Sequence, residues 1–303
     1  MIGFEFNKES RMSQKSIDVT ILESLNHLLV NHPGLLPAVY DIVHTQLGLP
    51  KDQLRWLLGQ NRIPLVDINQ FGYDLQLGVE HDIRSKYNFE GDLARIYAEN
   101  KGYLVHKWHH YIPLYERYFG AYRGKKIRFL EIGVSKGGSL QMWRQYFGDE
   151  AIIYGIDINP ECAQLNGIAG QVRIGSQTDT QFLASVVEEM GGVDIVLDDG
   201  SHQMEHIPVT LKALFPKVSE GGLYMIEDLH TAYWETFGGG YRSPHNFFST
   251  MVQDLMDDLH HWYHIDGMKV PEVSTFCPGI HIHDSVVVLE KQRVQKPSRS
   301  LIV

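Results

Sequence analysis

Hydrophobic and polar positions divide the chain into two regions with different periods. From Ser16 to about Leu58, apolar residues recur at helical spacing and prolines interrupt the pattern, which predicts two or three short helices. Beyond them the pattern fades into mixed polar sequence with Pro and Gly, as expected for a connection. We therefore place a boundary near residue 90, between a small helical N-terminal domain (1–90) and a larger domain (91–303).

In the larger domain, short apolar runs alternate with stretches of helical period. The runs that predict buried strands are KIRFLEIGV, AIIYGIDI, QVRIG, VDIVLDD and GLYMIEDL, and those that predict the helices between them are SLQMWRQYF, ECAQLNGI, TQFLASVVEEM and IPVTLKALFPKV. This alternation predicts an α/β fold, with a mostly parallel sheet covered by helices on both faces. Near the end, FCPGIHIHDSVVVLEK predicts two more strands, an antiparallel hairpin at the edge of the sheet.

Composition and charge limit the kinds of partner that the protein is expected to bind and the compartment in which it is expected. No apolar stretch approaches the roughly 20 residues that span a bilayer, and the first residues lack the apolar core of a signal peptide. The two cysteines, Cys162 and Cys277, form no metal or disulfide pattern. We therefore expect a cytoplasmic protein. The net charge of −10, from 37 acidic and 27 basic residues, argues against nucleic acid or an anionic membrane and favours a small-molecule partner.

Polar residues cluster where the first two strands end. Glu131 closes the first strand, and Gly133 and Gly137 let the backbone turn tightly against a ligand. Ser135 stands where a dinucleotide fingerprint has its second glycine, and packing alone would also explain such a turn. Asp157 ends the second strand, where a carboxylate either accepts hydrogen bonds from ribose hydroxyls or caps a helix.

The third strand closes with GSQTD, Gly175 to Asp179. The alternative role for Thr178 or Asp179 is to cap the next helix. A Gly-rich turn after the first strand and a carboxylate after the second nevertheless form a nucleoside pocket, with the end of the third strand placed beside an adenine.

Two pairs of acids end the fourth and fifth strands. Asp198 and Asp199 follow one apolar run, and Glu227 and Asp228 follow the next. Adjacent buried carboxylates need hydrogen bonds or a cation, and oxygen donors without a thiolate favour Mg²⁺. His202 comes three residues after Asp199 and is a candidate general base; its structural alternative is to cap the next helix or to pair with an acid.

Other histidines and aromatics receive less specific assignments. His206 and His230 flank the site and could contact a substrate, whereas His281 and His283 are expected to be structural because no paired carboxylate or thiolate stands near them in sequence. The segment TAYWETFGGGYRSPHN, residues 231–246, is rich in aromatics and glycine. We assign it to acceptor binding or to a lid.

Five motifs together resemble a known family. FLEIGVSKGG, YGIDINP, GSQTD, VLDDGSH and IEDLH, in this order, are similar to the class I S-adenosylmethionine-dependent methyltransferases. More narrowly, they resemble the metal-dependent sugar O-methyltransferases of the macrocin and mycinamicin type, which share their fold with the cephalosporin-hydroxylase-like group. The resemblance runs from about Ile83 to Lys291 and includes the lead-in ENKGYLVHKWHHYIPLYERYF. It implies a Rossmann-like fold.

The resemblance also implies roles for site residues. Those around S-adenosylmethionine would be Glu131, Gly133, Ser135 and Gly137 at the methionine portion, Asp157 at the ribose, Ser176 and Gln177 at the adenine, Asp198 at the amino group or methionine end, and Tyr111 closing over the cofactor. Those around Mg²⁺ would be Asp199, Glu227 and Asp228, with His202 as the general base.

The expected function is therefore Mg²⁺-dependent transfer of a methyl group from S-adenosylmethionine to a sugar hydroxyl of a glycosylated natural product, as in antibiotic biosynthesis. Two alternatives stay open: another vicinal-diol or catechol-like acceptor, and a cofactor-binding assembly subunit without catalysis. The intact set of acids with His202 argues against the second. We expect a homo-oligomer, a dimer or tetramer, with the N-terminal domain contributing to oligomerisation or covering the substrate.

Overall fold

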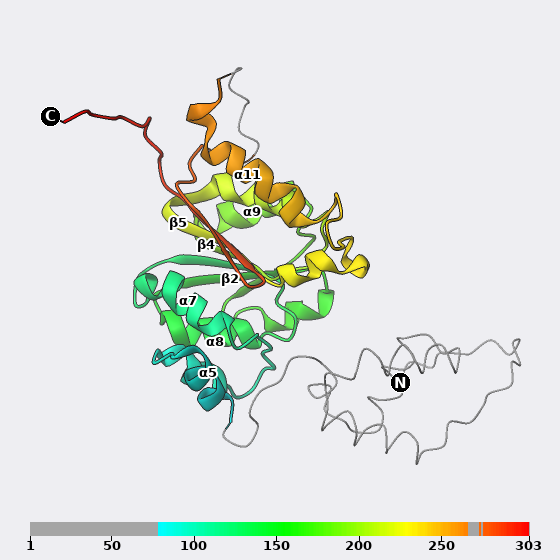
Figure 1. Cartoon of the computed structure of the whole chain (residues 1–303). Coiled ribbons are helices and arrows are strands. Elements are labelled where there is room, and N and C mark those ends of the chain that lie inside the picture. Colours follow the sequence, from blue (N-terminus) through cyan, green and yellow to red (C-terminus); the bar gives the residue numbers. More distant parts are fainter. Residues whose placement is uncertain (1–77, 266–272, 274, 303) are drawn as a thin grey trace, which may run out of the picture. The chain divides into compact units, whose positions relative to one another are not determined.

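A seven-stranded sheet runs through the part of the chain that the structure, a computed structural model, describes: residues 78–265, 273 and 275–302. Its strands are β1 (Arg128–Ile132), β2 (Ile152–Asp157), β3 (Gln171–Ile174), β4 (Val193–Asp198), β5 (Val218–Ile226), β6 (Ile280–His283) and β7 (Val286–Glu290). Their order is β3-β2-β1-β4-β5-β7-β6 (Figure 1). The strands β1 to β5 are parallel, and β7 pairs antiparallel with β5 and β6. The predicted α/β class and the antiparallel edge hairpin are confirmed.

Helices connect the parallel strands. The α-helices are α5 (Val79–Tyr87), α6 (Asp92–Ala98), α7 (Tyr111–Phe119), α8 (Gly138–Phe147), α9 (Thr180–Glu189), α10 (Ile207–Leu214) and α11 (Met251–Leu259). The short 3₁₀ segments are η2 (Gly120–Tyr122), η3 (Pro160–Leu165), η4 (Phe215–Lys217), η5 (Leu229–Tyr233), η6 (Glu235–Phe237), η7 (Phe247–Ser249) and η8 (His261–Tyr263). None of the described helices is long and apolar enough to cross a membrane.

One predicted helix has a different form. The segment ECAQLNGI folds as the 3₁₀ helix η3, with Pro160 at its first position. Gly167 has a φ of 82°, and its amide bonds the Gly170 carbonyl. The chain therefore turns back after six residues, too soon for a regular α-helix.

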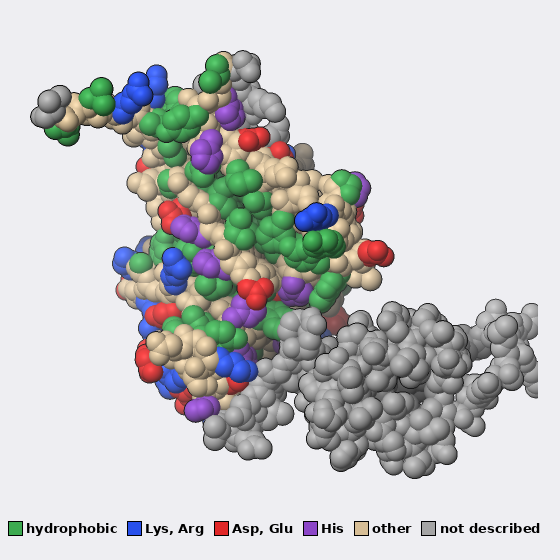
Figure 2. Space-filling view, in the orientation of Figure 1, with side chains coloured by type: hydrophobic (Ala, Val, Ile, Leu, Met, Phe, Trp, Pro, Cys, Tyr) green, Lys and Arg blue, Asp and Glu red, His purple; other side chains and the backbone are tan. Residues whose placement is uncertain are grey.

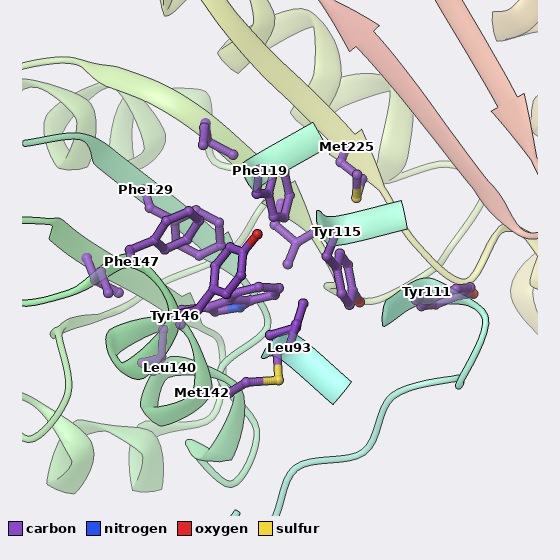
Figure 3. Close-up of a cluster of buried hydrophobic side chains, with 14 of the residues drawn as sticks. Leu93, Tyr111, Tyr115, Phe119, Phe129, Leu140, Met142, Tyr146, Phe147 and Met225 are labelled. Carbon is purple, nitrogen blue, oxygen red and sulfur yellow. The ribbon is translucent and has the colours of Figure 1, made fainter. Parts of the chain in front are cut away.

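Each face of the sheet carries its own hydrophobic core. Alternate strand residues point to opposite faces, so Phe129 joins one core and Leu130 the other. The first core contains residues of α5 to α8 and is dominated by aromatic rings, among them Phe119 and Phe129, whose centroids lie 6.0 Å apart (Figure 3). The second contains residues of α9, α10 and α11. Both faces are buried, which explains why the strands read as continuous apolar runs.

The compact unit that contains the sheet begins at Gly78. Ile83 in α5 and Leu93 in α6 are fully buried in the first core. The boundary therefore lies before the position near residue 90 that the sequence suggested, because both helices pack into the sheet's own core. The predicted N-terminal helices lie outside the described residues.

Candidate active site

The turn after β1 brings the ends of two strands into close contact. Gly133 has a φ of 93°, and a Cβ atom at this position would lie 2.0 Å from the Asp199 carbonyl oxygen. Gly137, with a φ of 81°, begins helix α8. Glu131 is fully buried, and its carboxylate accepts hydrogen bonds from Ser139 Oγ at 2.8 Å and Trp143 Nε1 at 3.2 Å. The turn thus needs glycine for the close approach of β1 to β4.

Replacing Gly133 by alanine is expected to destabilise the fold strongly. The side chain would collide with backbone that cannot move aside cheaply, adding about 1–3 kcal/mol of overpacking to the roughly 1–2 kcal/mol that a left-handed conformation costs an L-residue. Gly148 is the matched control, since its φ is 89° but its Cβ would meet nothing within 4 Å. Urea unfolding should show a clearly larger loss for Gly133→Ala than for Gly148→Ala. Equal losses would contradict the close approach.

Asp157, the last residue of β2, holds the turn after β1 in place through hydrogen bonds. Its Oδ2 accepts hydrogen bonds from the backbone amides of Val134 at 3.0 Å and Ser135 at 2.8 Å, and its Oδ1 accepts one from Asn159 at 2.8 Å. The side chain that caps η3 is that of Asn159, so Asp157 does not cap this helix. Oδ1 retains capacity for a further hydrogen bond from a ligand hydroxyl.

The buried side-chain amide of Gln177 links the segments that follow β3 and β4 through hydrogen bonds. Gln177 donates from Nε2 to Thr210 Oγ1 at 3.0 Å, accepts at Oε1 from the Ser201 amide at 2.7 Å, and lies 3.5 Å from Asp198 Oδ1. Ser176 hydrogen-bonds within its own turn to Thr178. Asp179 caps helix α9, the structural alternative considered for it. Of the two predicted adenine-side residues, Gln177 thus lies beside Asp198, with its amide engaged within the protein.

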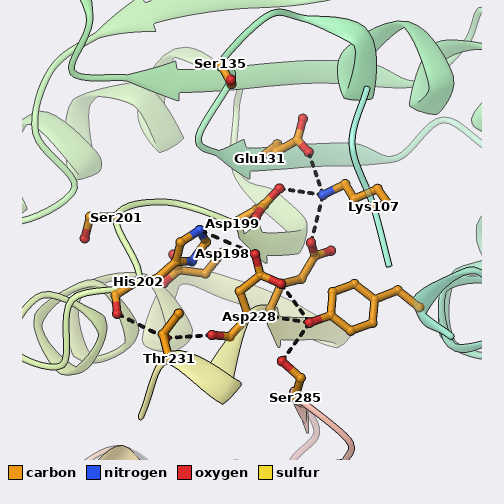
Figure 4. A network of polar contacts seen from close by, with 12 residues as sticks. Lys107, Glu131, Ser135, Asp198, Asp199, Ser201, His202, Asp228, Thr231 and Ser285 are labelled. Carbon is orange, nitrogen blue, oxygen red and sulfur yellow. Dashed lines mark hydrogen bonds and ion pairs between the residues drawn. The ribbon is translucent and has the colours of Figure 1, made fainter. Parts of the chain in front are cut away.

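Three side chains predicted for metal and proton chemistry come together at the ends of β4 and β5. His202 Nε2 lies 3.9 Å from Asp199 Oδ1 and 3.6 Å from Asp228 Oδ2 (Figure 4). One ligand atom from each of the three lies within 4.8 Å of the others, a spacing that could hold a metal ion. Each of these side chains is about one-fifth exposed. Helix α10 is preceded by His206, so His202 does not cap it.

Glu227, the third predicted metal ligand, is more deeply buried than Asp199 and Asp228. It is almost completely buried, its Oε2 lies 2.8 Å from Lys107 Nζ, and its Oε1 accepts a hydrogen bond from Tyr115. Lys107 Nζ also lies 2.5 Å from Asp199 Oδ2 and 3.8 Å from Glu131 Oε1 (Figure 4). One ammonium therefore pairs with acids from the ends of three neighbouring strands.

Tyr111 lies on the metal side of the site. Its hydroxyl is 2.8 Å from Asp228 Oδ1 and 2.7 Å from Ser285 Oγ, and its ring is buried. The phenol is thus held against Asp228, which follows β5, and the role of Tyr111 in closing over the cofactor stays a prediction. Lys107, Tyr111 and Tyr115 are spaced by four residues just before and within α7, a periodicity that could have indicated one shared face.

Burial raises the pKa values of several acids here. It raises the pKa of Glu131 to about 7, against the lowering effect of Lys107, and that of Asp198 to about 6, against a hydrogen bond from Tyr224. Burial alone would lower the pKa of Lys107, but Asp199, Glu227 and Glu131 outweigh it and raise that pKa well above the ordinary value. The three acids therefore favour the charged form of Lys107.

Backbone strain gathers at the same edge. Among the described residues that are not glycine, those with positive φ are Asn88, Ser135, His202, Asp228, Arg242 and Ser285. Four of the six belong to the Gly-rich turn or to the network of acids and histidine. Left-handed conformations cost such residues stability and tend to persist where function requires them.

An aromatic wall borders the acids. The His230 ring packs edge-on against Trp108 at 5.4 Å and Trp234 at 4.8 Å between centroids, and its Nδ1 lies 2.6 Å from Ser285 Oγ. Trp234 and Tyr241, from the segment that follows β5, are 44% and 77% exposed. The face shown in Figure 2 carries histidine and acidic side chains among hydrophobic ones. This wall offers flat, partly exposed rings next to Asp228.

The other histidines have structural partners. His281 pairs with Glu290 at 2.8 Å, and His283 lies 2.8 Å from the Tyr118 hydroxyl. The structural role predicted for the H-x-H spacing on β6 agrees with these contacts.

Comparisons with known proteins agree with this architecture. Residues 130–229 match a methyltransferase domain family. An 8-demethyl-8-(2-methoxy-α-L-rhamnosyl)-tetracenomycin-C 3'-O-methyltransferase of Streptomyces olivaceus is 36% identical over 222 residues, covering 70% of this chain and 56% of the relative. Demethylmacrocin O-methyltransferase of Streptomyces fradiae is 38% identical over 210 residues, covering 62% and 51%. The chain spans about half the length of these relatives.

A solved structure aligns over a similar share. The MycE methyltransferase of the mycinamycin biosynthetic pathway, in complex with Mg and SAH, is 34% identical with a TM-score of 0.58, covering 68% of this chain and 55% of that one.

The unit from Gly78 onward is thus a class I methyltransferase domain with a Rossmann-like fold. Within that class, the predicted resemblance to the macrocin and mycinamicin type of sugar O-methyltransferases is confirmed.

Proposed function

We propose that this protein is an O-methyltransferase that transfers the methyl group of S-adenosylmethionine to a hydroxyl of a sugar on a glycosylated natural product, in a reaction that requires Mg²⁺. The observation that carries the proposal is the meeting of Asp199, Asp228 and His202 at one strand edge, within 4.8 Å of one another. The relatives whose names specify sugar methylation supply the acceptor class.

The acids suit a hard divalent cation. Asp199 and Asp228 would hold it, and Glu227, next to Asp228 in the chain, completes the proposed ligand set. Carboxylate oxygens are the donors that Mg²⁺ prefers. Lys107 Nζ already lies between Asp199 and Glu227 at 2.5 and 2.8 Å, so this gap accommodates a positive charge. The bound ion would lower the pKa of a sugar hydroxyl that coordinates it.

The proposed cofactor pocket follows the carboxyl ends of β1 to β4. Glu131, Gly133, Ser135 and Gly137 would surround the methionine portion, Asp157 would accept hydrogen bonds from the ribose hydroxyls, and Ser176, Gln177 and Asp198 would border the adenine and the amino group. The bound cofactor would supply the electrophilic methyl group. The fastening of the Gly-rich turn by Asp157 supports this pocket, since the turn is held in place before a ligand arrives.

Replacing Asp157 by alanine is expected to weaken cofactor binding by about 1.5–3 kcal/mol, the usual worth of hydrogen bonds to a charged group, or roughly 10- to 150-fold in Kd. Calorimetry with S-adenosylhomocysteine measures this. Asp149→Ala removes the same charge from an exposed position and should leave the Kd unchanged. If Asp157→Ala binds S-adenosylhomocysteine as tightly as the original protein does, Asp157 does not bind the ribose.

His202 is the proposed general base. Its imidazole would take the proton of the acceptor hydroxyl as the methyl group moves, which gives the oxygen its nucleophilic character. Asp199 and Asp228, at 3.9 and 3.6 Å from Nε2, would stabilise the imidazolium that this step forms. Thr231 Oγ1 donates a hydrogen bond to the His202 carbonyl at 3.4 Å and helps to fix the residue.

The aromatic wall and residues 231–246 are proposed to receive the acceptor. Sugar faces stack on flat aromatic rings; Trp234 presents such a ring against His230, which lies 4.0 Å from Asp228, and Tyr241 of the same segment is exposed. A place in the cytoplasm, a homo-oligomeric state, and a role of residues 1–90 in oligomerisation or in covering the substrate belong to the same proposal.

The test is an incubation of the protein with methyl-labelled S-adenosylmethionine, Mg²⁺ and a panel of acceptors, read by mass spectrometry. The panel pairs each rhamnosylated or macrolide glycoside with its aglycone and adds a catechol. A gain of one methyl group on the sugar of a glycoside supports the proposal. Methylation of the catechol or of the aglycones instead would replace the acceptor class.

A further inference from the structure

Hydrogen bonds to the backbone of Lys107 fix this residue independently of its charged side chain. Its backbone amide donates to the Tyr97 hydroxyl at 3.1 Å, and that hydroxyl lies 3.0 Å from the Lys107 carbonyl oxygen. Helix α6 thus holds the main chain of this residue on both sides. The side chain is 2% exposed, so its ammonium is delivered into the site from a fixed backbone.

The acids around Lys107 greatly outnumber the positive charges. Five carboxylates gather at this edge: Glu131, Asp198, Asp199, Glu227 and Asp228. Within the described part of the chain, Lys107 is the one lysine or arginine that forms ion pairs with them. A buried carboxylate without a counter-charge is strongly destabilising, so the ammonium stabilises this cluster.

The two closest partners of Lys107 belong to the proposed metal ligands. Nζ lies 2.5 Å from Asp199 Oδ2 and 2.8 Å from Glu227 Oε2. An ammonium and a divalent cation cannot share this gap, because two positive charges repel strongly at such distances in a buried site.

We propose that Lys107 is a built-in cation that keeps the acids paired while the divalent ion is absent and gives up Asp199 and Glu227 when the ion binds. This inference rests on the proposed metal-dependent function. The ion must displace the ammonium, so its apparent affinity is reduced by the fraction of molecules in which the lysine occupies the gap. Lys107 therefore lowers the apparent affinity for the metal and stabilises the site when no metal is bound.

Replacing Lys107 by methionine removes the charge and keeps a flexible apolar side chain of similar length. In the full chain with saturating S-adenosylhomocysteine, titration with Mn²⁺ followed by electron paramagnetic resonance should show binding about tenfold tighter, or more, than in the original protein. Without metal, the variant should melt at a lower temperature. Mn²⁺ should raise its Tm by about twice as many degrees as it raises that of the original protein, or more.

The matched control is Lys126→Met, which removes one positive charge from an exposed position and should change neither quantity. Mn²⁺ binding that is unchanged or weaker in Lys107→Met, with an unchanged metal-dependent gain in Tm, would overturn the inference and leave the metal site standing. If the original protein binds no Mn²⁺, the proposed metal function fails and the inference fails with it.

A second measurement decides the matter if Lys107→Met does not fold with or without Mn²⁺. In the original protein, labelling of Lys107 by acetic anhydride, read by mass spectrometry, should speed up on addition of Mn²⁺, because a side chain released from its carboxylates loses its proton to solvent more readily and the neutral amine is the form that reacts. A labelling rate that Mn²⁺ leaves unchanged or lowers would overturn the inference.

Discussion

Replacing His202 by asparagine is expected to lower turnover by about 10²–10⁴-fold, the usual contribution of a general base. Asparagine is the sharper choice over alanine, because His202 has a φ of 57° and asparagine tolerates this left-handed conformation better. The loss of rate then reports the missing imidazole and not a distorted turn. Single-turnover kinetics with saturating acceptor, S-adenosylmethionine and Mg²⁺ measure it.

The variant should retain its cofactor and metal affinities within a few-fold, since neither is assigned to the imidazole. His260→Ala, at an exposed position that follows α11, serves as control and should turn over normally. A His202→Asn protein with unchanged turnover would remove the proposed base. A variant that instead loses Mn²⁺ binding would reassign His202 as a metal ligand, a role that its distances of 3.6 and 3.9 Å to the two acids also permit.

Replacing Asp199 by asparagine is expected to abolish metal-dependent activity while cofactor affinity stays within a few-fold. The substitution preserves the shape of the side chain but removes the charge of a proposed metal ligand, which is also the acid nearest to Lys107. Carboxylates bind Mg²⁺ much better than neutral amides. Mn²⁺ titration and calorimetry with S-adenosylhomocysteine separate the two affinities.

Asp257→Asn, on the exposed face of α11, removes the same charge elsewhere and should behave as the original protein. Metal binding of normal strength in Asp199→Asn would contradict its place in the ligand set. A parallel loss of cofactor binding would instead indicate that the close contact between Asp199 and the turn at Gly133 matters more than the charge.

The sheet could be predicted from the sequence because its strands are buried on both faces. The central strands appear as apolar runs with an acid at or directly after the end: Asp157 ends β2, Asp198 ends β4 and Glu227 follows β5. Residues at the ends of neighbouring parallel strands meet at one edge of a sheet, so the motifs also predicted which acids would gather. The edge hairpin was visible because its alternating residues flank a short turn.

Contacts that depend on distant segments could not be predicted in this way. Lys107 lies 92 residues from Asp199 and 120 from Glu227 in sequence, and its spacing of four residues from Tyr111 indicates a shared face at most, not the acids that it meets. The hydrogen bond from Tyr111 to Asp228 likewise joins residues 117 positions apart, and motif order says nothing about the direction of a side chain. The domain boundary was placed too late because the burial of Ile83 depends on tertiary packing and not on local pattern.

The most direct test of the account is methyl transfer to a glycoside acceptor after exhaustive removal of divalent ions by a chelator, followed by addition of Mg²⁺. If Asp199 and its neighbouring acids hold an ion that activates the sugar hydroxyl, the metal-free protein should bind S-adenosylmethionine but form no methylated sugar, and Mg²⁺ should restore the reaction. Undiminished formation of the methylated sugar in the metal-free protein would contradict the account.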